Sequence, residues 1–420
     1  MNDIFSPRPS TVLYVDINSC FATIEQQANP LIRGKPVVVA AYATGNGCIL
    51  ASSIESKRLG IKTGMHVREA QVISRDLTVL TPDPEKYRHV NVLLKNILSV
   101  YTDVVEVYSI DEMSLDVSKD PYFFRVSEGI QSVDASFAYA RKIKERIRKE
   151  IGEWIRVSIG ISTNVYLGKV ASDIQKPDGC TAIIKENVVE TLKKLSVEDL
   201  CGIKKGYGNR LRSSGMQTAY DMYRSTQDIL IRAFGSKIGR DWWLRLHGFT
   251  EGDRVYREEQ KTYGQSHALY IPKTPSDPET LSVLSQLVYK MARRLRETYS
   301  GASGVSLSCV FSGHESWQKS RTLSHSISSS DDFYKAVLLL LNQAPSLPIR
   351  ILAVSCFGMV SGNSVQEGLF DTRERKDSLT HALDIIGRKW GDDALMSARA
   401  LTGSSKVLDR IPFGRAGLKN

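Results

Sequence analysis

The sequence predicts an α+β protein of several domains, with a ferredoxin-like sheet in the first domain. Strands and helices follow one another over residues 11–162 in the order of a split βαβ unit. The 420 residues also exceed what one compact core holds, and the pattern beyond Gly179 predicts a second, small α/β unit. These two observations define the fold class.

A buried strand opens the first domain. Thr11–Ile17 is short, rich in β-branched residues and interrupted by Asp16 near its end. The elements that follow are a helix over Cys20–Ala28, a strand over Pro36–Ala41, a helix over Leu50–Leu59, a helix over Lys86–Val100, two strands within Asp103–Asp116, a helix over Ala135–Ile151 and a strand over Arg156–Ser162. In this order Leu31–Thr81 is an insertion in the ferredoxin-like sheet.

The pattern changes after Gly179. Residues 186–250 read as short helices separated by glycines, and the polar stretch 251–265 reads as a linker. The second unit, residues 266–361, is predicted as a strand, a helix over Thr280–Tyr299, strands over Val305–Phe311 and around Thr322, a helix over Asp331–Leu341 and a strand over Arg350–Phe357. A polar tail, 362–420, contains a predicted helix over Ser378–Trp390.

Composition excludes several classes of protein. The longest aliphatic run, Ala336–Leu341, is far shorter than the roughly 18 residues of a membrane helix, so no membrane association is expected. The N-terminus lacks the pattern of a signal peptide. The six cysteines are never closer than 21 positions, which argues against CxxC metal or redox pairs. We therefore expect free thiols and a cytoplasmic location.

Charge divides the chain unevenly. Residues 1–180 carry 22 basic and 21 acidic side chains, whereas residues 181–420 carry 34 and 25. A nearly neutral first part joined to a basic second part suggests chemistry in the first and contact with a polyanion in the second. A solvated basic surface without a partner is the equal alternative on charge alone.

Three carboxylates are candidates for a metal site. Asp16 ends one predicted strand, and Asp111 and Glu112 lie in the turn between two others. In a split βαβ sheet these ends can meet, and hard divalent ions such as Mg²⁺ prefer oxygen ligands. Acids at strand ends that face water are the alternative, although the adjacent pair Asp111–Glu112 would repel itself without a cation or solvent.

Phosphate-binding candidates lie nearby in the sequence. The segment INSCF, residues 17–21, begins a helix whose free N–H groups can meet phosphate oxygens, and Lys57 and Lys176 are basic groups able to reach the same place. Solvated lysines and a core role for Phe21 are the alternatives. The glycine- and lysine-containing turn within Leu200–Leu211 can present N–H groups to a nucleic-acid backbone, or simply connect two helices.

Taken together, the motifs resemble those of the Y-family translesion DNA polymerases. The segments are VLYVDINSCFATIEQ, SSIESKRLGIKTGM, YSIDEMSLD and VSIGISTNVYLGKVASDIQKPDG, and they occur in the family's order. The resemblance runs from about residue 11 to 370 and is closest to the bacterial polymerase IV and V branches. SIDE with its strand and the ASD-x-x-KP-x-G motif are its specific parts.

The resemblance implies a right-hand polymerase with a ferredoxin-like palm, small fingers, a helical thumb and a separate α/β little-finger domain. The implied boundaries are 1–30 and 82–180 for the palm, 31–81 for the fingers, 181–250 for a thumb with a helix-hairpin-helix-like turn, 251–265 for the linker, 266–361 for the DNA-binding little finger and 362–420 for a tail with a clamp-binding-like peptide.

The resemblance also assigns residues. The metal-binding set is Asp16, the Ile17 carbonyl, Asp111 and Glu112, with two Mg²⁺ ions for which Mn²⁺ can substitute. The incoming dNTP is assigned to Cys20, Phe21, Lys57 and Lys176, with Phe21 as the aromatic gate under the deoxyribose. Backbone contacts to DNA are assigned to Gly202, Lys204, Lys205 and Gly206. Binding to a sliding clamp is assigned to Gln366, Leu369 and Phe370.

Three positions depart from the family pattern. Asn18 stands where many members have a second Asp, and we do not count it as a ligand. Ile54 replaces a Tyr whose hydroxyl commonly contacts the triphosphate. Lys204 replaces the second Gly of the hairpin, where a lysine could itself meet DNA.

The sequence therefore predicts a template-directed, low-fidelity DNA polymerase of the translesion type, acting on primer-template DNA and dNTPs as a monomer. Two other classes remain as alternatives. A nucleotidyl cyclase also places carboxylates on a ferredoxin-like sheet, but it does not need the basic 181–420 region. A catalytically silent DNA-binding protein would keep the basic surface without needing the carboxylates.

Overall fold

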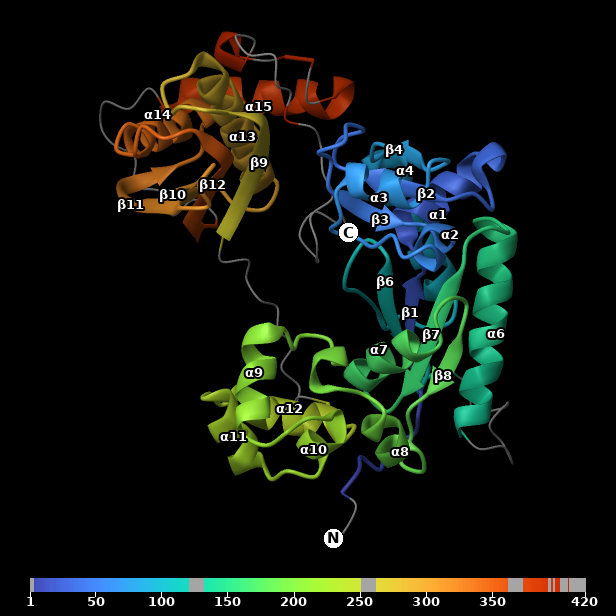
Figure 1. Ribbon diagram of the computed structural model, residues 1–420. Helices are drawn as coiled ribbons and strands as arrows, with labels where there is room; N and C mark the ends of the chain where they lie inside the picture. The colour runs from blue at the N-terminus through green and yellow to red at the C-terminus, as the bar shows by residue number, and fades with distance from the viewer. Residues whose placement is uncertain are drawn as a thin grey trace. The chain divides into compact units, whose positions relative to one another are not determined.

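The computed structural model describes residues 4–120, 132–250, 262–361, 373–391, 394–395, 397–400 and 407. These residues form two compact units, each with its own hydrophobic core (Figure 1). The first unit runs to Thr250 and the second begins at Thr262.

A five-stranded sheet in the order β5-β6-β1-β7-β8 is the framework of the first unit. Its strands are β5 (Val105–Val107), β6 (Glu112–Asp116), β1 (Val12–Ile17), β7 (Val157–Ser162) and β8 (Cys180–Ala182). The first four pair antiparallel, and β8 joins β7 in parallel. Helix α4 (Pro84–Ser99) precedes β5, and α6 (Ser132–Glu150) connects β6 to β7. The split βαβ order predicted from the sequence is confirmed.

The two faces of this sheet differ in chemistry because strand residues alternate between them. Leu13, Val15 and Ile17 of β1 are buried with apolar residues of α4 and α6. Tyr14 and Asp16 point to the opposite face, where α7 (Val165–Ile174) packs. Figure 1 shows α6 and α7 on opposite sides of the strands. The polar face under α7 carries the candidate site.

Glycines let α7 approach this face closely. A Cβ at Gly160 of β7 would lie 1.9 Å from the Gly168 carbonyl oxygen of α7, so only glycine permits this backbone contact. Asn164 caps the helix by accepting a hydrogen bond from the Leu167 N–H at 2.8 Å. Lys169, the next residue after Gly168, is thereby brought over β1 and β6.

The insertion in the sheet forms a small three-stranded sheet of its own, in the order β3-β2-β4. Its elements, with the helix before it, are α1 (Cys20–Ala28), η1 (Pro30–Ile32), β2 (Val37–Ala40), β3 (Ile49–Ser52), α2 (Ile54–Arg58), α3 (Val67–Ile73) and β4 (Thr78–Leu80). The helix predicted over Leu50–Leu59 is wrong in its first half. Residues 49–52 pair with β2 instead, and Ser53 caps a helix that begins only at Ile54.

Short helices follow β8, as the glycine punctuation predicted. They are α8 (Val188–Lys193), η2 (Val197–Asp199), α9 (Lys205–Ser213), α10 (Ala219–Tyr223), α11 (Gln227–Phe234) and α12 (Ile238–Leu246). Asn164 attaches them to the sheet because its amide donates to the carbonyls of Arg245 and Phe249, both at 2.9 Å. The helical part therefore lies next to the N-terminus of α7.

The second unit is a four-stranded antiparallel sheet, in the order β11-β10-β12-β9, with two helices packed on it. Its elements are β9 (Thr262–Lys273), α13 (Pro278–Arg296), β10 (Gly301–Phe311), β11 (Ser316–Ile327), α14 (Ser330–Leu341) and β12 (Ile349–Val360). The predicted α/β unit is present, and its first strand begins four residues before Ser266, inside the stretch read as a linker.

Part of the predicted polar tail folds onto α13. Helix α15 (Arg373–Trp390) contains the predicted Ser378–Trp390 helix, and its Asp384 accepts two hydrogen bonds of 2.7 Å from Arg296. After the short η3 (Ala398–Ala400), Val407 is buried in the core of the second unit. The ion pair between Arg296 and Asp384 and the buried Val407 thus attach part of the polar tail to the second unit.

Gln366, Leu369 and Phe370 lie outside the described residues, so the clamp-binding peptide stays a prediction. All six cysteines are free thiols, as expected. Within the described part of the chain, no helix is long and apolar enough to cross a membrane.

Candidate active site

Asp16 and Glu112 face each other across two paired strands. They are direct partners in the β1–β6 register, so their side chains emerge on the same face of the sheet. Asp16 is 4% exposed and Glu112 is half-buried. Two like charges this close need a cation between them.

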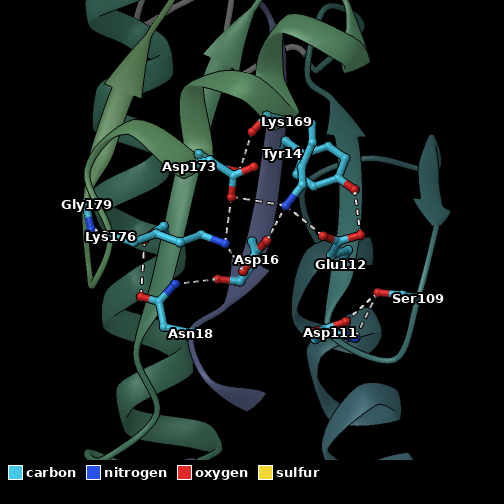
Figure 2. Close-up of polar contacts among 12 residues, drawn as sticks. Tyr14, Asp16, Asn18, Ser109, Asp111, Glu112, Lys169, Asp173, Lys176 and Gly179 are labelled. Carbon is cyan, nitrogen blue, oxygen red and sulfur yellow. Dashed lines mark hydrogen bonds and ion pairs between the residues drawn. The ribbon is translucent and has the colours of Figure 1, made fainter. Parts of the chain in front are cut away.

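Lys169 supplies that cation in the structure (Figure 2). Its ammonium lies 2.6 Å from Asp16 Oδ2, 2.7 Å from Glu112 Oε1 and 3.2 Å from Asp173 Oδ1. The Tyr14 hydroxyl donates to Glu112 Oε2 at 3.2 Å, and the Tyr14 ring lies beneath the ammonium. Carboxylate oxygens that gather around a cation are ligands that a hard divalent ion prefers, so the chemistry of these donors suits the expected metal.

Lys176 occupies the other oxygen of Asp16. Its ammonium lies 2.8 Å from Asp16 Oδ1 and 2.7 Å from Asp173 Oδ1. Lys169 and Asp173 lie one turn apart on α7, and Lys176 follows in the loop after the helix, so that both ammonium groups contact Asp173. Both oxygens of Asp16 are therefore paired with lysines.

Asp111 is oriented differently from the other two carboxylates. Its Oδ1 accepts a hydrogen bond of 2.5 Å from the Ser109 hydroxyl, and Figure 2 shows this pair apart from the lysines. Among the described residues, no three His, Cys, Asp or Glu side chains are grouped as a metal site. Asp16 and Glu112 thus lie opposite each other, whereas Asp111, which precedes Glu112 in the chain, bonds to Ser109, so a convergence of all three carboxylates on one metal site stays a prediction.

These contacts shift the protonation equilibria of the cluster. Burial raises the pKa of Asp16, but Lys169 and Lys176 outweigh burial and hold that pKa below its ordinary value. Burial, with the Asp16 charge, raises the pKa of Asp111, and burial also raises that of Glu112 despite Lys169. Burial lowers the pKa of Lys169, but Asp16 and Glu112 raise it overall, so Lys169 stays charged.

The loop after α7 is fixed to the end of β1 by Asn18. The Asn18 side-chain oxygen accepts hydrogen bonds from the Asp178 N–H at 2.7 Å and the Ser158 hydroxyl at 3.2 Å. Asp178 is also paired with Lys144 and Arg148 of α6, at 2.9 Å and 2.6 Å. Asn18 therefore positions the loop that carries Lys176.

The N-terminus of α1 follows immediately after Asp16 and Ile17. Ser19 adopts a left-handed conformation with φ 53° and turns the chain so that the helix begins at Cys20. Phe21, one residue later, is partly buried and stacks on Tyr87 with ring centroids 4.3 Å apart. The Tyr87 hydroxyl donates to Glu25 at 2.8 Å, which fixes the ring behind Phe21.

Lys57 interacts electrostatically with Lys176 and Asp16 of this cluster. Its pKa is held below the ordinary value by partial loss of hydration and by the nearby Lys176 ammonium, while Asp16 acts in the opposite direction. Two lysines close enough to repel each other are the electrostatic setting for a polyanion. Ile54, at the first position of α2, offers no hydroxyl there.

The predicted DNA-binding turn is exposed on the short-helix region. Gly202 has φ 95°, a conformation that glycine adopts readily. Lys204 is the N-cap residue of α9 and has an extended backbone. Any residue adopts this conformation, so a lysine is accommodated where the family pattern has glycine. Lys205 and Gly206 form the first turn of α9, and all four residues are exposed.

Comparisons with known proteins agree with this architecture. Residues 15–173 match the impB/mucB/samB family, and residues 260–369 match the C-terminal domain of the same family. DNA polymerase IV of Pelotomaculum thermopropionicum is 30% identical over 95% of this chain and 97% of that protein. DNA polymerase IV of Moorella thermoacetica is 32% identical over 94% of this chain and 97% of that protein.

Among solved structures, a Y-family DNA polymerase chimera, Dbh–Dpo4, superposes with a TM-score of 0.70. It is 24% identical, and the match covers 84% of this chain and 99% of the chimera, which shows the shared fold. The chain belongs to the impB/mucB/samB family and is a Y-family translesion DNA polymerase. Membership implies dependence on a divalent metal ion.

The sequence alone does not identify Lys169, Asp173 and Tyr14 as members of this cluster. The partners of Lys169 come from β1 and β6, far away in the sequence. The spacing Lys169-x3-Asp173-x2-Lys176 was the available signal, since it places three charges near one helix face.

Proposed function

We propose that the polar edge of the five-stranded sheet is the nucleotidyl-transfer site of this polymerase. The main observation behind this proposal is that Asp16 and Glu112 face each other, with Asp111 preceding Glu112 in the chain. Asp16 also lies shortly before the N-terminus of α1. In the reaction the primer 3′-oxygen bonds to the α-phosphorus of a dNTP, and the bond from that phosphorus to pyrophosphate breaks.

Asp16, Asp111, Glu112 and the Ile17 carbonyl would hold two Mg²⁺ ions, for which Mn²⁺ can substitute. Bound there, the metal lowers the pKa of the primer 3′-hydroxyl and neutralises charge on the leaving pyrophosphate. The register of β1 and β6 fixes two of these carboxylates before substrate arrives, so their positioning costs nothing during the reaction.

The triphosphate and the sugar are assigned to neighbouring residues. The backbone N–H groups of Cys20 and Phe21 lie at a helix N-terminus, where anions are favoured, and Lys57 and Lys176 add positive charge. Phe21, backed by Tyr87, is placed to reject a 2′-hydroxyl by steric contact. The insertion that would cover the base pair is small, which favours a spacious pocket, tolerance of damaged templates and low fidelity.

DNA binding is assigned to the basic part of the chain. Residues 181–250 alone carry 12 basic and 7 acidic side chains, and Lys204 and Lys205 stand exposed at the start of α9. Such contacts to phosphates position a duplex without reading its sequence. We also propose that the chain acts as a monomer that a sliding clamp recruits, and the six free thiols favour a cytoplasmic location.

Primer extension tests the assignment. With primer-template DNA, dNTPs and Mg²⁺, the full chain should add nucleotides to the primer, whereas Asp111→Ala and Glu112→Ala should lose at least about a hundredfold in rate, because several kcal/mol of transition-state stabilisation is removed. DNA affinity should change little in both variants. A rate within tenfold of the wild type, in a variant that folds and binds DNA, would reject the role of that carboxylate.

A further inference from the structure

Both carboxylate oxygens of Asp16 are paired with lysines. Its Oδ1 is 2.8 Å from Lys176 and its Oδ2 is 2.6 Å from Lys169, so neither oxygen is available to another cation without breaking an ion pair. In the proposed function the same Lys176 serves the triphosphate. The Lys176 ammonium is therefore assigned to two anions, the Asp16 carboxylate and the triphosphate, and it cannot pair fully with both at the same time.

The two lysines are held very differently. Lys169 is 13% exposed, contacts three carboxylates and lies over the Tyr14 ring, on a helix locked to the sheet at Gly160. Lys176 is 34% exposed and lies in the loop beyond the end of α7, where it contacts two carboxylates. Moving Lys169 would leave the buried Asp16 and the half-buried Glu112 facing each other without a cation, whereas moving Lys176 uncovers one oxygen of Asp16.

A second lysine, Lys57, is affected by the charge of Lys176. Burial and, after it, the Lys176 charge lower the pKa of Lys57, and no described acidic side chain forms an ion pair with Lys57. An anion between Lys57 and Lys176 would replace their repulsion by attraction. The triphosphate, which carries several negative charges, is that anion in the proposed function.

We propose that Lys176 couples nucleotide binding to metal binding by exchanging Asp16 for the triphosphate. The inference rests on the proposed function of this site. Before a nucleotide arrives, Lys176 covers Asp16 Oδ1. The arriving triphosphate takes the ammonium and leaves that oxygen free to bind a metal ion. Lys169 stays in place and keeps Asp16 and Glu112 facing each other.

With such an exchange, nucleotide binding strengthens metal binding. Because the coupling is reciprocal, metal binding strengthens nucleotide binding by the same factor. Anything that withdraws Lys176 from Asp16 should favour a cation on Asp16. Anything that removes the Asp16 charge should free Lys176 for an anion, even when no metal is present. The second consequence is unusual, because loss of a catalytic carboxylate is expected to tighten nucleotide binding.

The test measures the affinity of the full chain for dCTP in EDTA, by equilibrium dialysis with labelled nucleotide. Asp16→Asn should bind dCTP about fivefold or more tightly than the wild type. Asp111→Asn is the matched control, because it removes the same charge from the same cluster but from a carboxylate that bonds to Ser109 and contacts no lysine among the described ion pairs. Equal tightening in the two variants would overturn the exchange and leave only a general charge effect.

A second measurement approaches the coupling from the metal side. Binding of Mn²⁺ to the full chain without nucleotide is followed by electron paramagnetic resonance. Lys176→Met should tighten Mn²⁺ binding about fivefold, whereas Lys57→Met, which removes an equal charge that covers no carboxylate, should tighten it less. If both variants bind Mn²⁺ alike, Lys176 does not block Asp16.

These outcomes separate the inference from the function on which it rests. If the wild-type chain extends primers but Asp16→Asn and Asp111→Asn bind dCTP with equal affinity, the proposed exchange is wrong and the proposed site still stands. If Lys176→Met leaves the affinity for dCTP unchanged in EDTA, the assignment of Lys176 to the triphosphate is itself wrong. Circular dichroism of each variant checks that it is folded, and Lys176→Arg should restore the coupling in part because it restores the charge.

Discussion

The contact between Gly160 and Gly168 is where a very small change should disturb the whole site. Gly160→Ala places a Cβ 1.9 Å from the Gly168 carbonyl oxygen and 2.4 Å from the Ser172 nitrogen. An ordinary contact of this kind begins near 3.4 Å, so α7 and β7 must separate by about 1.5 Å. Lys169 moves with the helix.

The magnitude follows from two opposing effects. Overpacking of this kind costs about 1–3 kcal/mol of folding free energy, whereas replacing glycine by alanine stabilises by about 0.4–1 kcal/mol through the unfolded chain. The variant should therefore be less stable by about 1–2 kcal/mol. Displacing a positioning group by about 1 Å can cost about a hundredfold in rate, so nucleotide incorporation should fall by about that factor.

Urea unfolding and single-nucleotide incorporation under single-turnover conditions measure the two effects. Gly313→Ala is the matched control, because a Cβ at Gly313 meets no atom within 4 Å. It should keep the wild-type rate and lose no stability. A Gly160→Ala protein with wild-type stability and rate would refute the argument that backbone contact between α7 and β7 positions Lys169.

Three further predictions concern sugar choice, pH and salt. Phe21→Ala should raise incorporation of rNTPs relative to dNTPs, measured by competing the two substrates, and an unchanged ratio in an active variant would make Phe21 a core residue only. Burial raises the pKa values of Asp111 and Glu112, whose ionised forms bind metal, so activity should begin to fall with decreasing pH above the range where carboxyl groups ordinarily titrate. More Mg²⁺ should move this acid limb to lower pH, and an acid limb that does not depend on Mg²⁺ would contradict the expectation. Replacing Lys204 and Lys205 by Gln should weaken DNA binding and reduce its salt slope by about one for each lysine that meets a phosphate, and an unchanged slope in a fluorescence-anisotropy titration would remove the turn from the DNA contact.

Local patterns in the sequence predicted most of the sheet because its central strands are continuous apolar runs. Thr11–Ile17 and Arg156–Ser162 are almost fully buried, so their residues follow from the hydrophobic pattern alone. The position of Asp16 at the end of β1 followed from the same reasoning. The fold class and the opposition of Asp16 and Glu112 could thus be predicted without a structure.

What failed depended on contacts between distant segments. Residues 49–52 have a helix-compatible sequence, but pairing with β2 makes them a strand. Lys169 joins the site only because α7 docks at Gly160, a contact that no local pattern encodes. Val407 is buried against the second unit although the tail around it is polar. In each case tertiary packing decides the outcome.

Asp16, Asp111 and Glu112 are proposed to hold the metal ions of nucleotidyl transfer, and the proposed function depends on this assignment. Anomalous diffraction from crystals of the full chain with primer-template DNA, a dNTP analogue that resists hydrolysis and Mn²⁺ tests it most directly. The account predicts two manganese peaks about 3.5–4 Å apart, in contact with these three carboxylates, with Lys176 on the triphosphate. Manganese bound away from Asp16 and Glu112, in a complex that holds the analogue opposite its template base, would contradict the account.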